Sequence, residues 1–170
     1  MKTPAGDPAL PLRLRPACLD DVEELSGLCL RSKALWGYSD EMLDAFRPEL
    51  EITTDMIRIS QIQVVEQNGQ LVAMARLVGC CQGSSEAWLE ALFVDPEWLG
   101  QGLGQTLFKW AVERCRNADV VSLLMDADPN AEAFYLRMGA CRVGEVASTC
   151  LGSRLLPRLQ LLIEPARHKQ

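Results

Sequence analysis

The stretch from Ala87 to Cys115 reads AWLEALFVDPEWLGQGLGQTLFKWAVERC, and it decides how the rest of the chain is interpreted. An apolar run from Trp88 to Val94 stops at Asp-Pro, three glycines follow at alternate positions, and apolar residues then recur at helical spacing. This order predicts a strand, a turn and a helix that begins near Gly102. Because glycine has no Cβ, the turn can point successive N–H groups into one concavity at the positive end of the helix. Such a turn binds phosphate.

Two common phosphate-binding motifs do not fit this turn. A nucleotide P-loop requires Gly-Lys followed by Ser or Thr, and the turn has no lysine. The dinucleotide fingerprint, counted from Gly100, would place Gln105 at its third glycine. A nucleotide-dependent enzyme is therefore disfavoured.

The same stretch resembles the acetyl-CoA-binding motif of the GCN5-related N-acetyltransferase (GNAT) superfamily, which is Arg/Gln-x-x-Gly-x-Gly/Ala after a strand ending in Val-Asp-Pro. Gly102 and Gly104 match its small positions, whereas Leu99 stands where Arg or Gln is usual. The resemblance implies that the turn holds the CoA pyrophosphate and that the strand end pairs with the pantetheine arm. The alternative is that the glycines serve only a tight connection. The implied cofactor-binding residues are Phe93, Val94, Leu99, Gly100, Gln101, Gly102, Leu103, Gly104 and Gln105.

A second segment, Asn130 to Ala140, resembles the GNAT motif Asn-x-x-Ala-x-x-Phe-Tyr-x-x-x-Gly-Phe, with Ala140 in place of the last aromatic residue. The resemblance implies that Asn130 bonds the pantetheine amide. Tyr135 would then be the general acid for the CoA thiolate, because a phenol with a pKa near 10 can protonate a thiolate. The alternatives are a core tyrosine and a helix N-cap.

The general base is predicted by elimination. His168 is the only histidine and lies beyond the last predicted strand, so histidine catalysis is disfavoured. Strand alternation would place Glu90 on the same face as Trp88 and Leu92, and carboxylates among apolar groups have raised pKa values that suit a base. The alternative is an exposed or hydrogen-bonded glutamate without a catalytic role. Asp126 and Asp128, after the next predicted strand, are further candidates.

Composition limits the class of protein. The 170 residues, 48% hydrophobic and 24% charged, predict one domain over 1–170 with a flexible 1–11 and a tail at 165–170. We find no apolar run of membrane-spanning length and no signal-peptide core, which predicts a cytoplasmic protein without a membrane partner. The net charge of −6 disfavours nucleic acid and mildly favours cationic ligands. Seven cysteines without C-x-x-C spacing predict free, mostly buried thiols and no metal site.

The remaining patterns predict an α/β fold of mixed (α+β) type. It resembles the GNAT fold, with a mostly antiparallel central sheet of six to seven strands, one parallel pair and about four helices. Asn68-Gly69 predicts a hairpin, and Ser39 an N-cap. The other expected strands are 12–16, 61–66, 71–78, 120–125, 142–149 and 159–164, and the other expected helices are 19–30, 39–49 and 131–138.

Together these features predict an acetyl-CoA-dependent N-acyltransferase that moves an acetyl group to a primary amine by direct attack. The alternative is a non-catalytic CoA-binding module. The acceptor, a small-molecule or peptide amine, is expected to meet the loops 32–39 and 152–157. Trp36 and Tyr38 either line its site or bury a helix connection, and Asp126 is a weaker contact candidate. A homodimer could pair through the strand Leu159 to Ile163.

Overall fold

The computed structural model describes residues 11–164, in which one strand, three helices and three strands are followed by a helix, a strand, a helix and two final strands. The expected tail at 165–170, His168 and all of the expected flexible segment 1–11 except Pro11 lie outside the described residues. The elements are β1 (Arg13–Pro16), α1 (Val22–Ala34), α2 (Asp40–Leu50), α3 (Thr54–Ile59), β2 (Gln61–Gln67), β3 (Gln70–Val78), β4 (Glu86–Val94), α4 (Leu103–Asn117), β5 (Ser122–Asp126), α5 (Glu132–Arg137), β6 (Cys141–Ala147) and β7 (Leu155–Leu162).

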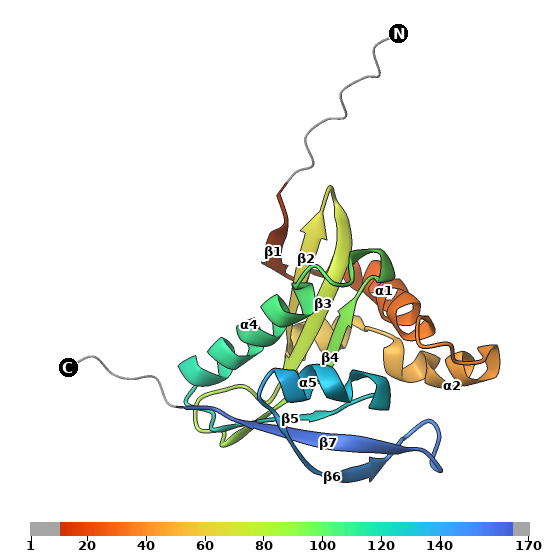
Figure 1. Ribbon diagram of the computed structural model, residues 1–170. Helices are drawn as coiled ribbons and strands as arrows, with labels where there is room; N and C mark the ends of the chain where they lie inside the picture. The colour runs from red at the N-terminus through yellow and green to blue at the C-terminus, as the bar shows by residue number, and fades with distance from the viewer. Residues whose placement is uncertain (1–10, 165–170) are drawn as a thin grey trace.

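The strands of residues 11–164 form one seven-stranded sheet in the order β1-β2-β3-β4-β5-β7-β6. Every neighbouring pair is antiparallel except β4 and β5, which are parallel and joined through α4. The predicted mixed, mostly antiparallel sheet is therefore confirmed. Figure 1 shows that β5, β7 and β6 run at a large angle to β2 and β3, so the sheet is strongly twisted and opens beside β4.

Local sequence signals account for several element ends. Ser39 accepts a hydrogen bond from the Met42 N–H and caps α2, as predicted. Asn68 and Gly69 both have positive φ, +50° and +79°, which is the conformation of a two-residue hairpin turn. Gly139, with φ +94°, ends the segment that contains α5.

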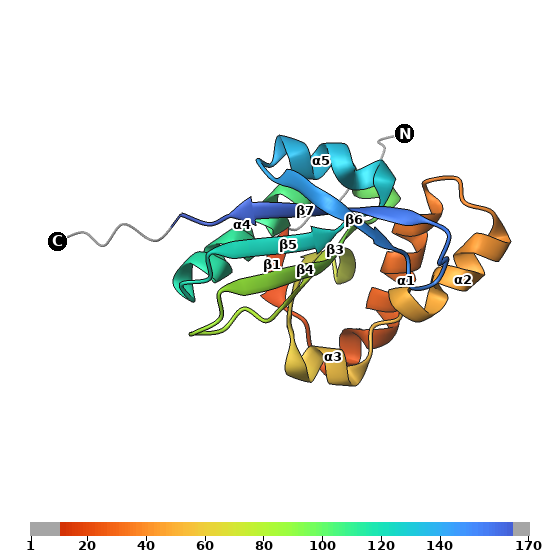
Figure 2. The same ribbon diagram turned by 90° about the horizontal axis from the view of Figure 1, so that it is seen from below.

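Apolar side chains pack on both faces of the sheet. On β3, Ala73 and Ala75 belong to the core beneath α4 and α5, whereas Met74 between them faces α1 and α2. Figure 2 shows the same division, with α1 and α2 gathered on one side of the strands and α4 on the other. Each completely buried leucine, such as Leu28 on α1 and Leu107 on α4, contributes roughly 1.5–3 kcal/mol through burial.

The structure differs from the expected fold in three details. Helix α3 was not predicted, so residues 11–164 hold five α-helices rather than four. Strand β7 lies between β5 and β6, so Leu159 and Gln160 at the start of the expected pairing strand are occupied on both edges, whereas Leu161 and Leu162 pair only with β5 among the described strands. All seven cysteines are free as expected, but only Cys29, Cys80 and Cys115 are buried. None of the helices within the described range has the length and apolar character that a bilayer span requires.

An ion-pair network anchors β1 to the rest of the sheet. Arg15 donates to the Glu66 carboxylate on β2 at 2.6 Å and to both carboxylate oxygens of Asp21 at 2.7 and 2.9 Å. Asp21 also accepts from the Cys18 N–H at 2.7 Å. The Arg15 hydrogen bond outweighs burial and lowers the pKa of Asp21 from 3.8 to about 2. Asp21 is thus a stabilising charge at neutral pH.

We expect Asp21→Asn to lower the free energy of unfolding by at most about 2 kcal/mol at pH 7. Since the folded pKa lies below the unfolded one, this contribution is complete above pH 3.8 and is lost as the pH falls toward 2. Urea unfolding of both proteins between pH 7 and pH 2.5 measures the difference. A difference that stays constant down to pH 2.5 would contradict the assignment.

Candidate active site

The glycine turn before α4 forms an open row of hydrogen-bond donors. Gly100 and Gly102 have φ of +75° and +79°, and Gly102 is the N-cap of α4. Among residues 11–164, no acceptor is bonded to any backbone N–H from Gly100 to Gln105. A Cβ added at Gly100 or Gly102 would meet no atom within 4 Å, so open space borders these donors. The turn therefore has the donors, the helix polarity and the room that a pyrophosphate requires.

Strand β4 has an open edge next to this turn. Its parallel pairing with β5 runs only from Glu86↔Ser122 to Trp88↔Leu124, whereas its pairing with β3 continues to Val94. The backbone polar groups of Phe93 and Val94 on the β5 side are therefore not used by a described strand. An extended amide-containing arm could pair there as an added strand.

Glu90 does not occupy the apolar environment that strand alternation predicts. Arg76 pairs with Ala91 and Leu77 with Leu89, so Glu90 is the extra residue of a β-bulge. The bulge reverses the alternation, because Leu89 and Leu92 now pack into the same core. The Glu90 side chain is 43% exposed and accepts a hydrogen bond from the Arg76 guanidinium at 2.7 Å. The predicted environment is wrong, while the catalytic role of Glu90 stays a prediction.

Tyr135 is buried among aromatic rings next to the start of α4. Its ring centroid lies 6.0 Å from that of Phe108 and 5.1 Å from that of Phe134. Phe134 in turn lies 3.5 Å from the position of a Cβ added at Gly104, so α5 and the glycine turn are neighbours. Burial raises the pKa of the Tyr135 hydroxyl above its ordinary value of 10, so this group stays protonated at neutral pH. That is the protonation state a general acid needs.

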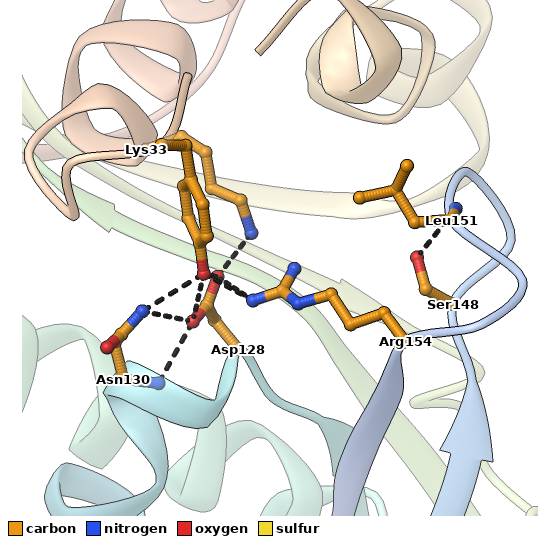
Figure 3. Close-up of polar contacts among 7 residues, drawn as sticks. Lys33, Asp128, Asn130, Ser148, Leu151 and Arg154 are labelled. Atoms are coloured by element: carbon orange, nitrogen blue, oxygen red, sulfur yellow. Dashed lines mark hydrogen bonds and ion pairs between the residues drawn. The ribbon is translucent and has the colours of Figure 1, made fainter. Parts of the chain in front are cut away.

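Past the end of β5, a polar cluster is centred on Asp128 (Figure 3). We call it the Asp128 cluster. Its carboxylate accepts from Lys33 of α1 at 2.5 Å, from Arg154 before β7 at 3.2 Å and from the Tyr38 hydroxyl at 2.8 Å. The side-chain amide of Asn130 donates to Asp128 and to the Tyr38 hydroxyl, both at 3.0 Å. Four segments of the chain therefore meet at one carboxylate.

The charges within the Asp128 cluster determine its protonation. Burial alone would raise the pKa of Asp128, but hydrogen bonds led by the one from Lys33 outweigh it and lower that pKa to about 2. Burial and the neighbouring Asp128 carboxylate raise the pKa of Tyr38 to about 12. At pH 7 Asp128 is ionised and Tyr38 is neutral. Asp128 is then a weak base, which disfavours it as the proton acceptor.

The other predicted contact residues differ in their surroundings. Tyr38 packs edge-on against Phe46 with centroids 5.2 Å apart and belongs to the Asp128 cluster. Trp36 is 45% exposed and therefore does not bury the helix connection. Asp126 accepts two hydrogen bonds from Arg158, at 2.7 and 2.8 Å. The three candidate carboxylates, those of Glu90, Asp126 and Asp128, are thus all paired with basic side chains.

Sequence reasoning missed the basic partners in this region. Lys33, at the end of α1, and Arg154, before β7, lie within the two segments 32–39 and 152–157 that were expected to meet the acceptor, but no pattern distinguished them from other surface cations. Arg76 lies within a strand, where its partner depends on the bulge in β4. No group of three His, Cys, Asp or Glu residues that could hold a metal occurs in the part of the chain that the structure describes.

Comparisons with known proteins agree with this geometry. The sequence model of the acetyltransferase (GNAT) family matches residues 19–140. An uncharacterized N-acetyltransferase, ycf52, of Pyropia yezoensis is 25% identical over 91 residues, which are 54% of this chain and 51% of that protein. The chain therefore spans about half the length of this relative.

Two solved structures have the same fold. One is the PaiA N-acetyltransferase of Thermoplasma acidophilum in complex with coenzyme A, with a TM-score of 0.72 and 16% identity over 89% of this chain and 98% of that chain. The other is the ribosomal-protein-S18-alanine N-acetyltransferase of Escherichia coli, with a TM-score of 0.65 and 19% identity over 94% of this chain and 98% of that chain. At these identities the likeness concerns the fold alone.

Proposed function

This chain belongs to the acetyltransferase (GNAT) family, and on that premise we propose that it is an N-acetyltransferase that moves an acetyl group from acetyl-CoA to a primary amine. The observation that carries the proposal is the row of N–H groups from Gly100 to Gln105, which have no acceptor within residues 11–164, beside the open edge of β4. One feature binds a pyrophosphate and the other an extended amide arm. CoA combines both groups in one molecule.

The residues of the turn and of the strand end would hold this cosubstrate, which supplies the acetyl thioester. Backbone groups of Phe93 and Val94 would pair with the pantetheine arm, and the turn from Gly100 to Gln105 would bind the pyrophosphate. Asn130 would turn its amide from the Asp128 cluster toward the pantetheine. Tyr135 would hold the proton that the departing sulfur requires.

Glu90 is the carboxylate that we propose as proton acceptor for the amine, acting through water because its side chain is 43% exposed. It lies at the bulge of β4, two residues past Trp88, the last residue of this strand that pairs with β5. The ion pair with Arg76 holds it in place. An amine must lose its proton to attack the thioester, since its unperturbed pKa is near 10.

We expect Glu90→Gln to lower kcat by about 100-fold or more, the range of a general base, while the Kd for acetyl-CoA stays unchanged. Steady-state kinetics with the best acceptor of an amine panel would measure this. The matched control is Glu86→Gln, which changes an exposed glutamate at the other end of the same strand. Equal kcat values for Glu90→Gln and the wild type would exclude Glu90 as the base.

The second candidate function is a CoA-binding module without catalysis. It is favoured by the pairing of Glu90, Asp126 and Asp128 with basic side chains, which leaves none of these three carboxylates unpaired. The deciding experiment measures CoA release with a broad panel of small and peptide amines. Release that depends on an amine supports the acetyltransferase, whereas acetyl-CoA binding without release from any amine supports the module.

A further inference from the structure

The Asp128 cluster has more hydrogen-bond donors than acceptors. Asp128 receives hydrogen bonds from Lys33, Arg154, Tyr38 and both the backbone and side-chain nitrogens of Asn130. A carboxylate offers about four lone-pair sites, so this acceptor is saturated. A substrate ammonium would find no free acceptor on Asp128.

The two cations of the Asp128 cluster retain free donors. Lys33 has three N–H donors, and among residues 11–164 its ammonium donates a hydrogen bond only to Asp128. Arg154 uses Nη2 for Tyr38 and Asp128, while its Nε and Nη1 have no partner among residues 11–164. The Lys33 and Arg154 side chains are 13% and 17% exposed, so most of each side chain is packed while the donors without a partner border solvent. Charged donors at the border of solvent can exchange water for an acceptor group of a ligand.

The net charge of the Asp128 cluster also favours an incoming acceptor group. Lys33 and Arg154 carry two positive charges against one negative charge on Asp128, and Tyr38 is neutral at pH 7 because its pKa is raised to about 12. Glu49 of α2 faces Cys150 near the cluster, but it is exposed and has no ion pair with either cation. The cluster therefore has a positive charge left over for an anionic ligand.

The two cations are held in place rather than free to move away. The Lys33 ammonium lies 4.5 Å from the ring centroid of Phe46, and the Arg154 guanidinium lies 5.3 Å from it. The loop before Arg154 is closed by hydrogen bonds from Ser148 N–H to Arg154 C=O and from Arg154 N–H to Leu151 C=O, both 2.7 Å. Figure 3 shows Arg154 extending from this loop toward Asp128. A fixed pair of donors of this type suits a planar carboxylate.

We propose that the acceptor is a primary amine that also carries a carboxylate, and that Lys33 and Arg154 bind this carboxylate. The proposal rests on the acetyltransferase function above and names the substrate class of the same site. Asn130, which the CoA arm would engage, is also a member of the Asp128 cluster. The carboxylate at Lys33 and Arg154 would thus orient the substrate with its amine toward the thioester.

The test compares matched acceptors that differ only in charge. Amino acids are compared with their carboxamides. Ala-Asp and Ala-Glu, as dipeptides with a free N-terminus and an amidated C-terminus, are compared with Ala-Asn and Ala-Gln of the same form. We expect kcat/KM for the best carboxylate-bearing acceptor to exceed that of its neutral partner by about 10- to 100-fold, the worth of one charged hydrogen bond. The difference should appear mainly in KM, because the carboxylate binds away from the reacting atoms.

Variants assign this preference to the two cations. Arg154→Met and Lys33→Met should each reduce the preference to a few-fold, and Arg154→Lys should keep part of it because the charge remains. The control Arg47→Met removes an exposed arginine of α2, outside the Asp128 cluster, and should keep the full preference. The Tm and the Kd for acetyl-CoA of each variant show that folding and cosubstrate binding are intact.

The outcomes separate the two proposals. Amine-dependent turnover without a carboxylate preference, or with a preference that survives both Met variants, overturns this inference and leaves the acetyltransferase function standing. Acetyl-CoA binding without turnover of any amine overturns both.

Discussion

Gly102→Trp is expected to abolish acetyl-CoA binding, raising the Kd by at least about 100-fold, because the indole would stand in the open space bordered by the unpaired N–H groups. Loss of only two charge-assisted hydrogen bonds to the pyrophosphate gives an effect of this size. Isothermal titration calorimetry of the wild type and the variant measures it directly.

The control for this experiment is Gly69→Trp. Gly69 has the same φ of +79°, and a Cβ added there also meets nothing within 4 Å, but it lies in the turn between β2 and β3. Both variants should therefore lose a similar roughly 1–2 kcal/mol of stability from a side chain at positive φ. Only Gly102→Trp should lose acetyl-CoA. Equal binding by the two variants would mean that the turn does not hold the cosubstrate.

Tyr135→Phe is expected to lower kcat by about 100-fold or more while the Kd for acetyl-CoA changes by less than about 2-fold. The hydroxyl has no hydrogen-bond partner among residues 11–164, and the ring packs against Phe108 and Phe134, so the variant keeps the packing. Its Tm should consequently stay close to that of the wild type. Pre-steady-state and steady-state rates would locate the loss in the chemical step.

The leaving group provides the control for Tyr135→Phe. An acetyl thioester of an aromatic thiol releases a much less basic thiolate, which needs little help from a general acid. The ratio of wild-type to variant rates should therefore be much smaller with that donor than with acetyl-CoA. A ratio that is the same for both donors, or full turnover of the variant with acetyl-CoA, would remove Tyr135 from the reaction.

Much of the fold could be predicted because its signals lie within short stretches of sequence. The strand, glycine turn and helix from Trp88 to Cys115 follow from local periodicity and from residues that accept positive φ. The hairpin at Asn68-Gly69 and the Ser39 cap are equally local. The crossover through α4 then required a parallel pair, and β4 and β5 form it. Helix α3, with only six residues, is too short for a clear periodic pattern.

Only part of the candidate site could be predicted from local sequence signals. The residues of the glycine turn could be named because a phosphate cradle is made by consecutive backbone groups. The surroundings of Glu90 could not be predicted, because one bulge in β4 reverses the alternation of the strand and turns the carboxylate toward Arg76 and solvent. The negative net charge also suggested cationic ligands, whereas the local charge of the Asp128 cluster is positive.

The sequence by itself thus determined the order of the elements apart from α3, the one parallel pair and the donor-lined turn before α4, because backbone conformation depends mostly on neighbouring residues. The tertiary structure decided which side chains meet beyond the end of β5. Arg154 reaches Tyr38 across 116 positions of the chain, and Lys33 reaches Asp128 across 95. Contacts between residues so far apart in the sequence depend on how the sheet opens beside β4 and on which loops fold over the opening. No local sequence pattern encodes such contacts.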